Sequence, residues 1–167
     1  ALARRLHRAS AEPGPFDRLT GDEDLKSVVL VDQSPIGRTP RSTPATYSGL
    51  MGPVRRLFAA TSLAKVRGYG ADRFSFNTGP GRCPDCEGAG VRRLTMDFLP
   101  DVDVPCEACG GQRFGPETLE VRFKGRNVAE VLDLPVEEAR EFLGNVPACR
   151  RILEVMDGVG LGYLRLG

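Results

Sequence analysis

The chain of 167 residues is predicted to adopt an α/β fold that is interrupted by a small cysteine-rich module. A continuous apolar run at residues 28–31 is typical of a buried strand in an α/β sheet. Segments with helical periodicity lie on both sides of it. Two copies of a Cys-x-x-Cys-x-Gly pattern follow, at residues 83–88 and 106–111.

The first part of the chain has few regular elements. Apolar residues recur at helical spacing in residues 1–9, and the Pro-Gly-Pro sequence at 13–15 ends that pattern. The strand predicted at Val28–Val31 leads into residues 33–44, which contain too much proline and serine for regular structure. A helix is expected next, with Pro53 in its first turn.

Beyond the cysteines, the pattern predicts one strand and three helices. The strand is expected at residues 119–123, where polar and apolar residues alternate, with a turn at Lys124-Gly125. A helix capped by Asn127 should continue to Leu132. Another is expected from Val136 to Leu143, after Pro135, and the last from Pro147 to Met156, ending at Gly158.

The net charge of +1 hides a strong asymmetry. Residues 34–82 contain eight basic side chains and one acid, whereas residues 83–142 contain thirteen acids and seven bases. The basic side chains of the first segment, called here the basic block, are Arg38, Arg41, Arg55, Arg56, Lys65, Arg67, Arg73 and Arg82. Such a block can neutralise phosphates. Composition alone slightly favours a solvated helix face above core aromatic residues.

The four paired cysteines are predicted to bind one structural zinc ion. Cys83 and Cys86 are separated from Cys106 and Cys109 by nineteen residues, a spacing typical of four-cysteine zinc sites. Four thiolates complete a tetrahedral shell and leave no position for water or substrate. Two disulfides or two unrelated pairs are the alternatives. Cys149, alone in an apolar helical pattern, is expected in the core.

Other function classes find little support. No phosphate loop, nucleophile elbow or His-Glu-x-x-His sequence occurs, so the chain is not expected to catalyse a reaction alone. No apolar run approaches the roughly 20 residues that span a bilayer, and a membrane partner is not expected. Reduced cysteines in metal-type pairs make the cytoplasm the expected location.

Several uncommon strings closely resemble the second ATP-binding half of the UvrA family, the ABC-type ATPases of bacterial nucleotide excision repair. They include Val31–Ser42, Pro44–Tyr47, Arg73–Asn77, Phe98–Val102, Glu117–Val121 and Val159–Tyr163. The resemblance covers nearly the whole chain. It implies an α/β (α+β) fragment of an ABC-type ATPase half, with an inserted helical signature domain and a four-cysteine zinc module.

The resemblance also implies a division of the chain. Residues 1–45 would belong to the ATP-binding core and include its Q-loop. Residues 46–79, with part of 113–160, would form the helical signature-domain insert, and residues 80–112 the zinc module. Residues 113–167 would return to the signature domain and the ATP-binding core. The Walker A, signature and Walker B motifs would lie outside this segment, which is therefore expected to be inactive alone.

By the same resemblance, Gln33 is the Q-loop glutamine, which lies near ATP and Mg²⁺. The basic block becomes a DNA-facing surface. Its implied DNA contacts are Lys65, Arg67 and Arg73, with Arg55 and Arg56 as further candidates. The segment would recognise damaged double-stranded DNA and couple the ATP state to DNA binding. The implied partners are a second UvrA copy and, in the full-length context, UvrB.

Three alternatives remain. Residues 83–90 match the Cys-x-x-Cys-x-Gly-x-Gly repeat of DnaJ-type chaperones, although Gln112-Arg113 breaks the second copy. The unusual residues 111–116 also fit a UvrA-like paralogue linked to drug resistance. The third alternative is a zinc-stapled insert without a ligand of its own.

Overall fold

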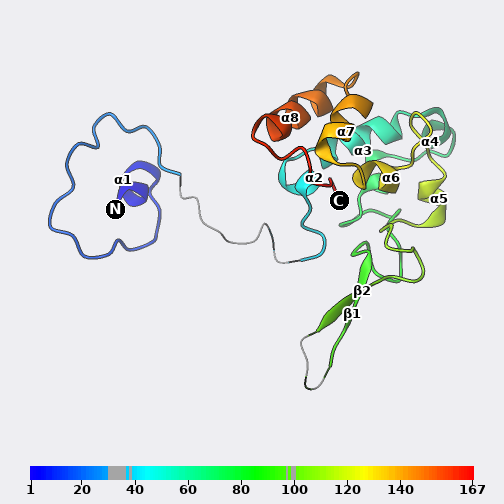
Figure 1. Ribbon diagram of the computed structural model, residues 1–167, viewed down its shortest axis with the longest axis horizontal. Coiled ribbons are helices and arrows are strands. Elements are labelled where there is room, and N and C mark those ends of the chain that lie inside the picture. The colour runs from blue at the N-terminus through cyan, green and yellow to red at the C-terminus, as the bar shows by residue number, and fades with distance from the viewer. Residues whose placement is uncertain (30–36, 38, 97, 99–100) are drawn as a thin grey trace. The chain divides into compact units, whose positions relative to one another are not determined.

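The computed structural model describes residues 1–29, 37, 39–96, 98 and 101–167 (Figure 1). The chain divides into two compact units, Ala1–Pro35 and Ile36–Gly167. Each unit is described by itself. No helix among the described residues is long and apolar enough to cross a membrane.

The first unit contains helix α1, Leu2–His7, as the periodicity predicted. Two polar contacts tie the following loop to this helix. The Arg5 guanidinium donates to the buried Asp22 carboxylate at 2.9 Å, and His7 Nε2 accepts a hydrogen bond from the backbone N–H of Val28 at 3.0 Å.

The strand predicted at residues 28–31 is not borne out where the structure describes it. Val28 and Val29 belong to no strand, and Val29 is 79% exposed. Leu30 and Val31 lie outside the described residues. A buried strand needs neighbours for its backbone N–H and C=O groups, and the described part of this unit contains no strand that could pair with it.

The second unit is mainly helical, and its helices come from both sides of the cysteines in sequence (Figure 1). Before the cysteines lie α2 (Pro44–Tyr47), α3 (Met51–Ala59), α4 (Ser62–Val66) and the 3₁₀ helix η1 (Ala71–Phe74). After them lie α5 (Pro116–Leu119), α6 (Val128–Leu132), α7 (Val136–Phe142) and α8 (Pro147–Gly158).

One hydrophobic core joins these two sets of helices. Phe58 of α3 packs against Phe74 of η1 with ring centroids 5.6 Å apart, and α3 also contacts α8. Phe76 meets Phe114 edge to face at 6.0 Å. All four rings are almost completely buried. Since Phe76 precedes the cysteines and Phe114 follows them, this second pair closes the core beneath the cysteine-rich segment.

The helices predicted after the cysteines are confirmed. Asn127 caps α6 in a capping box with Glu130, in which each side chain accepts from the other residue's backbone N–H. Pro135 is the N-cap of α7. Helix α8 begins at Pro147 as predicted and includes Gly158, where the sequence pattern had placed its end.

The strand predicted at residues 119–123 is wrong. Leu119 is the last residue of α5, because Pro116 sits in the first turn of a short helix. Phe123 pairs with Arg126 in an isolated bridge only. Between them, Lys124 and Gly125 both have positive φ, at 48° and 82°. The predicted turn is therefore present, and it reverses the chain directly between Phe123 and Arg126.

A β-hairpin that the sequence pattern did not predict lies between the two cysteine pairs. Strand β1, Val91–Leu94, pairs antiparallel with β2, Val102–Pro105. It extends away from the helices (Figure 1). Most of its side chains are exposed, so it lacks the alternation of apolar and polar residues that marks a half-buried strand.

Replacing Asn127 by alanine should lower the free energy of unfolding of the second unit by about 1 kcal/mol, because both bonds of the capping box are lost. Urea denaturation followed by circular dichroism measures the change. Asn145→Ala is the matched control, since Asn145 is exposed in the turn between α7 and α8. Equal stability of the two variants would contradict the capping role.

Candidate metal centre

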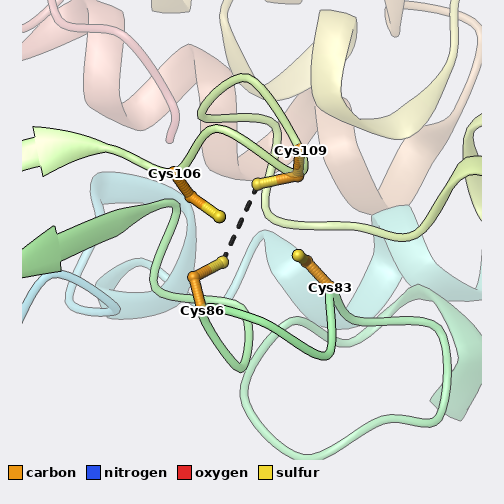
Figure 2. A group of neighbouring side chains, drawn as sticks. All are labelled: Cys83, Cys86, Cys106 and Cys109. Carbon is orange, nitrogen blue, oxygen red and sulfur yellow. Dashed lines mark hydrogen bonds between the residues drawn. The ribbon is translucent and has the colours of Figure 1, made fainter.

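Four cysteine side chains converge where the β-hairpin meets the helical part (Figure 2). Cys83 and Cys86 precede β1, and Cys106 and Cys109 follow β2. The hairpin register, which places Val91 opposite Pro105, brings the two pairs together. All four sulfurs lie within 4.8 Å of one another, and all four residues are buried.

The sulfur geometry fits a tetrahedral metal ion. A tetrahedron with metal–sulfur bonds of about 2.3 Å has sulfur–sulfur edges of about 3.8 Å. The Cys86 and Cys109 sulfurs are 3.7 Å apart. A disulfide would need about 2.05 Å, and all four cysteines are free thiols. The donor set therefore matches a four-thiolate metal centre.

Each cysteine pair and the four residues after it form what is called here a knuckle, at residues 83–90 and 106–113. The two knuckles are built alike and are hydrogen-bonded to each other. The backbone N–H of Cys83 donates to the carbonyl of Arg113 at 2.9 Å, and the N–H of Cys106 donates to the carbonyl of Gly90 at 2.9 Å. Each knuckle thus supplies the acceptor for the first cysteine of the other. The N–H of Gly90 also points at the Cys86 sulfur, at 3.3 Å, which favours negative charge on that sulfur.

Burial opposes ionisation of the thiols. Desolvation raises the pKa of Cys109 to about 12 and also raises the pKa of Cys83. The pKa of Cys106 is lowered, chiefly by a hydrogen bond from the backbone of Cys109. Thiolates at such a site need a bound cation to balance them.

Cys149 lies in the helical core, as the sequence predicted. It is fully buried on α8, and burial raises the pKa of its thiol to about 11. It belongs to the apolar cluster of the helices and not to the group of four. Gln33, predicted to lie near ATP, falls outside the described residues.

Two of the predicted DNA-contacting arginines are engaged within the chain. Arg67 forms an ion pair with Glu120 at 2.5 Å, and Arg73 forms one with Glu117 at 2.6 Å. Both guanidinium groups also flank the ring of Tyr69, at 5.9 and 4.3 Å from its centroid. The acidic partners were missed from the sequence because they follow the cysteine module and approach only through the fold.

The other three predicted contacts have no such partner. No carboxylate among the described residues lies within ion-pair distance of Arg55, Arg56 or Lys65. Arg56 and Lys65 are exposed on α3 and α4, which pack together. Arg55 is half-buried, and its Nε lacks a hydrogen-bond partner.

Replacing Cys106 by serine should reduce bound metal from one ion per chain to far less, because only three thiolates remain. The check is metal content after purification, with the thiolate-to-Co²⁺ absorption of the cobalt-substituted protein as a second readout. Cys149→Ser, which changes a buried cysteine outside the group of four, should keep one ion. Equal metal content in both variants would contradict the assignment of the four ligands.

The whole chain is similar to bacterial UvrA proteins, although no protein-family model matches it. It is 58% identical to UvrABC system protein A of Neisseria meningitidis over 165 residues, which cover 99% of this chain and 17% of that protein. It is 55% identical to UvrABC system protein A of Thermus thermophilus over its full 167 residues, which cover 18% of that protein.

A solved structure supports the same relationship. The crystal structure of UvrA2 from Deinococcus radiodurans matches with a TM-score of 0.78 and 56% identity, covering 81% of this chain and 17% of that one. The chain thus spans less than a fifth of the length of these relatives. On this sequence and structural similarity, the chain belongs to the UvrA family and corresponds to one segment of its members.

Proposed function

We propose that this chain is a DNA-binding segment of a nucleotide excision repair protein, built around a structural zinc ion. The observation that carries the proposal is the match over the whole chain to UvrABC system protein A at 51–58% identity. The match to UvrA2 further supports a fragment related to ABC-type ATPases. The helical part would be its signature-domain insert.

Zinc is the metal that the donor set favours, because four thiolates in a tetrahedron are typical of structural zinc sites. Cys83, Cys86, Cys106 and Cys109 would hold it and fill its coordination shell. Zinc supplies no chemistry at such a site. Its free energy of binding stabilises the module, because the unfolded chain offers no preformed site.

The DNA contact that fits these side chains is to the phosphate backbone. Arg55, Arg56 and Lys65 have no acidic partner among the described residues, so no ion pair has to break before they meet a phosphate. Arg56 and Lys65 are exposed, whereas Arg55 is half-buried. Backbone contacts carry no sequence information. A protein that recognises many lesions has to detect deformability of the duplex, and such contacts suit that task.

Arg67 and Arg73 would join this contact only by exchanging partners. Each is paired with a carboxylate of the α5 region, so a phosphate must displace Glu120 or Glu117 first. The two acids then act as internal competitors for DNA. They lower the affinity of the basic block for any polyanion.

The remaining features of the proposal belong to the larger protein. Gln33 would approach ATP and Mg²⁺ as a Q-loop glutamine, and the nucleotide state would be transmitted to the DNA-binding residues. A second UvrA copy, UvrB and damaged double-stranded DNA are the proposed partners, in the cytoplasm. The DnaJ-type alternative is not favoured, because the UvrA match extends far beyond residues 83–90.

Changing Arg55, Arg56 and Lys65 together to glutamine should weaken DNA binding about tenfold or more and reduce the slope of log K against log salt by about 2 to 3, because each phosphate contact contributes about 0.9. Fluorescence anisotropy with a labelled duplex between low and physiological salt measures both quantities.

The matched control neutralises three exposed bases of the first unit, Arg4, Arg8 and Lys26, and changes the net charge equally. Binding should then stay close to that of the unchanged chain. Equal losses in the two triple variants would mean that net charge alone governs binding. Absence of any salt-dependent DNA binding would refute the proposed function.

Changing Glu117 and Glu120 to glutamine should raise DNA affinity several-fold and steepen the salt dependence by about 1 to 2, because Arg67 and Arg73 are released for phosphates. The same anisotropy titration applies. Glu137→Gln/Glu138→Gln on α7 removes two exposed acids that have no basic partner among the described residues. If both double variants bind alike, the competition idea fails.

A further inference from the structure

The two knuckles share one backbone pattern that favours glycine at three positions. In each, the first, second and fourth residues after the second cysteine have positive φ. In the first knuckle these are Glu87, Gly88 and Gly90, at 51°, 83° and 76°. In the second they are Gly110, Gly111 and Arg113, at 56°, 82° and 70°. Glycine therefore occupies four of the six positions, and Glu87 and Arg113 occupy the other two.

A side chain at such a position needs an explanation, because the left-handed conformation is unfavourable for residues with a Cβ. Glycine would adopt it without strain. The Arg113 guanidinium and the Glu87 carboxylate make contacts that glycine could not provide. Both residues in fact reach the same distant stretch of chain, residues 39–43, called here the strap.

Arg113 joins the strap to the first knuckle. One nitrogen of its guanidinium donates to the carbonyl of Pro40 at 2.8 Å and to that of Ala89 at 2.9 Å. The guanidinium also lies over the Phe76 ring, 5.1 Å from its centroid. Burial lowers the pKa of Arg113, and attraction to Cys86 and Cys109 opposes that effect. The positive group is thus placed beside the sulfurs and the strap at once.

Glu87 contacts a second residue of the strap, Arg41. The Arg41 guanidinium donates to the backbone carbonyl of Glu87 at 3.0 Å and lies 3.8 Å from its carboxylate. Arg82, directly before the first cysteine, lies 3.6 Å from the same carboxylate. The carboxylate therefore sits between two arginines, one from the strap and one from the entry to the metal centre.

We propose that Glu87 and Arg113 form a clamp that fixes the strap to the cysteine knuckles, so that metal occupancy determines how firmly the strap is held. The clamp depends on the knuckles for its support, because both residues belong to the turns that the cysteines define. The strap follows Gln33 within ten residues. A link from the metal centre to the nucleotide therefore rests on the proposed function, whereas the clamp itself does not.

Two hydrogen bonds from backbone N–H groups of the strap can report whether the strap is held in place. The N–H of Ser42 donates to the carbonyl of Thr39 at 2.9 Å, and the N–H of Thr43 donates to Thr46 Oγ1 at 2.9 Å. Both bonds lie at the junction of the strap with α2. If the clamp opens, these amides should exchange with solvent faster, while the helical core keeps its protection.

Hydrogen exchange of the zinc-loaded chain tests the clamp with Glu87→Gly/Arg113→Gly. Glycine suits both backbone positions, so the knuckles and the bound metal should be retained. We expect exchange at Ser42 and Thr43 about tenfold faster, because the Arg113 hydrogen bonds and the ion pair of Arg41 with the Glu87 carboxylate are lost. The bond from Arg41 to the backbone carbonyl of residue 87 can remain. Removing the metal from the unchanged chain should accelerate the same amides.

Lys124→Gly is the matched control, because Lys124 also has positive φ and its ammonium donates to the carbonyl of Phe142 at 2.9 Å. It should leave the strap unaffected. Unchanged exchange in the double glycine variant with metal bound would overturn the proposal. Should that variant lose its metal, Arg41→Gln alters the strap alone, and unchanged exchange there overturns it equally. The hydrogen-exchange experiment uses neither DNA nor nucleotide. Its result therefore does not depend on the outcome of the DNA-binding experiments.

Discussion

The convergence of four sulfurs on one point is the constraint that the cysteine-rich segment of the second unit is built around. A segment of about thirty residues leaves the helical core at Cys83 and returns at Phe114, and an isolated bridge between Arg82 and Phe114 joins its two ends. The hairpin inside it is too exposed to fold by burial of its own side chains. A metal ion bound by both pairs would close this loop and fix the hairpin register.

Sequence reasoning was most successful where a local pattern carries its own physical cause. Paired cysteines at zinc-type spacing identified the candidate ligands, and Asn127 with Glu130 marked a helix start by its capping chemistry. The strand predicted at 119–123 failed because alternation over five residues is weak evidence against the helix-starting effect of Pro116. The hairpin was not predicted because its strands lack apolar alternation. Their register would be fixed by the cysteine centre and not by burial of their own side chains.

Contacts between distant segments could not be predicted from the sequence. Arg67 and Arg73 look like free charges in a basic block until the fold brings Glu120 and Glu117 beside them. Arg113 interrupts the repeat in sequence, yet its conformation matches that of Gly90 in the first knuckle. In both cases the side chain is known from the sequence, and only tertiary structure identifies its partner. The Q-loop assignment of Gln33 stays a prediction.

The bridge between Arg82 and Phe114 also affects how much the length of the cysteine-rich segment can vary. Gly115 donates its N–H to the carbonyl of Gly81 at 3.0 Å, so the entry and exit of the cysteine-rich segment already lie one ladder step apart. A short turn could join them without stretching any connection in the helices. In topological terms the segment is an insertion, and its length could change while the path of the surrounding backbone stays the same.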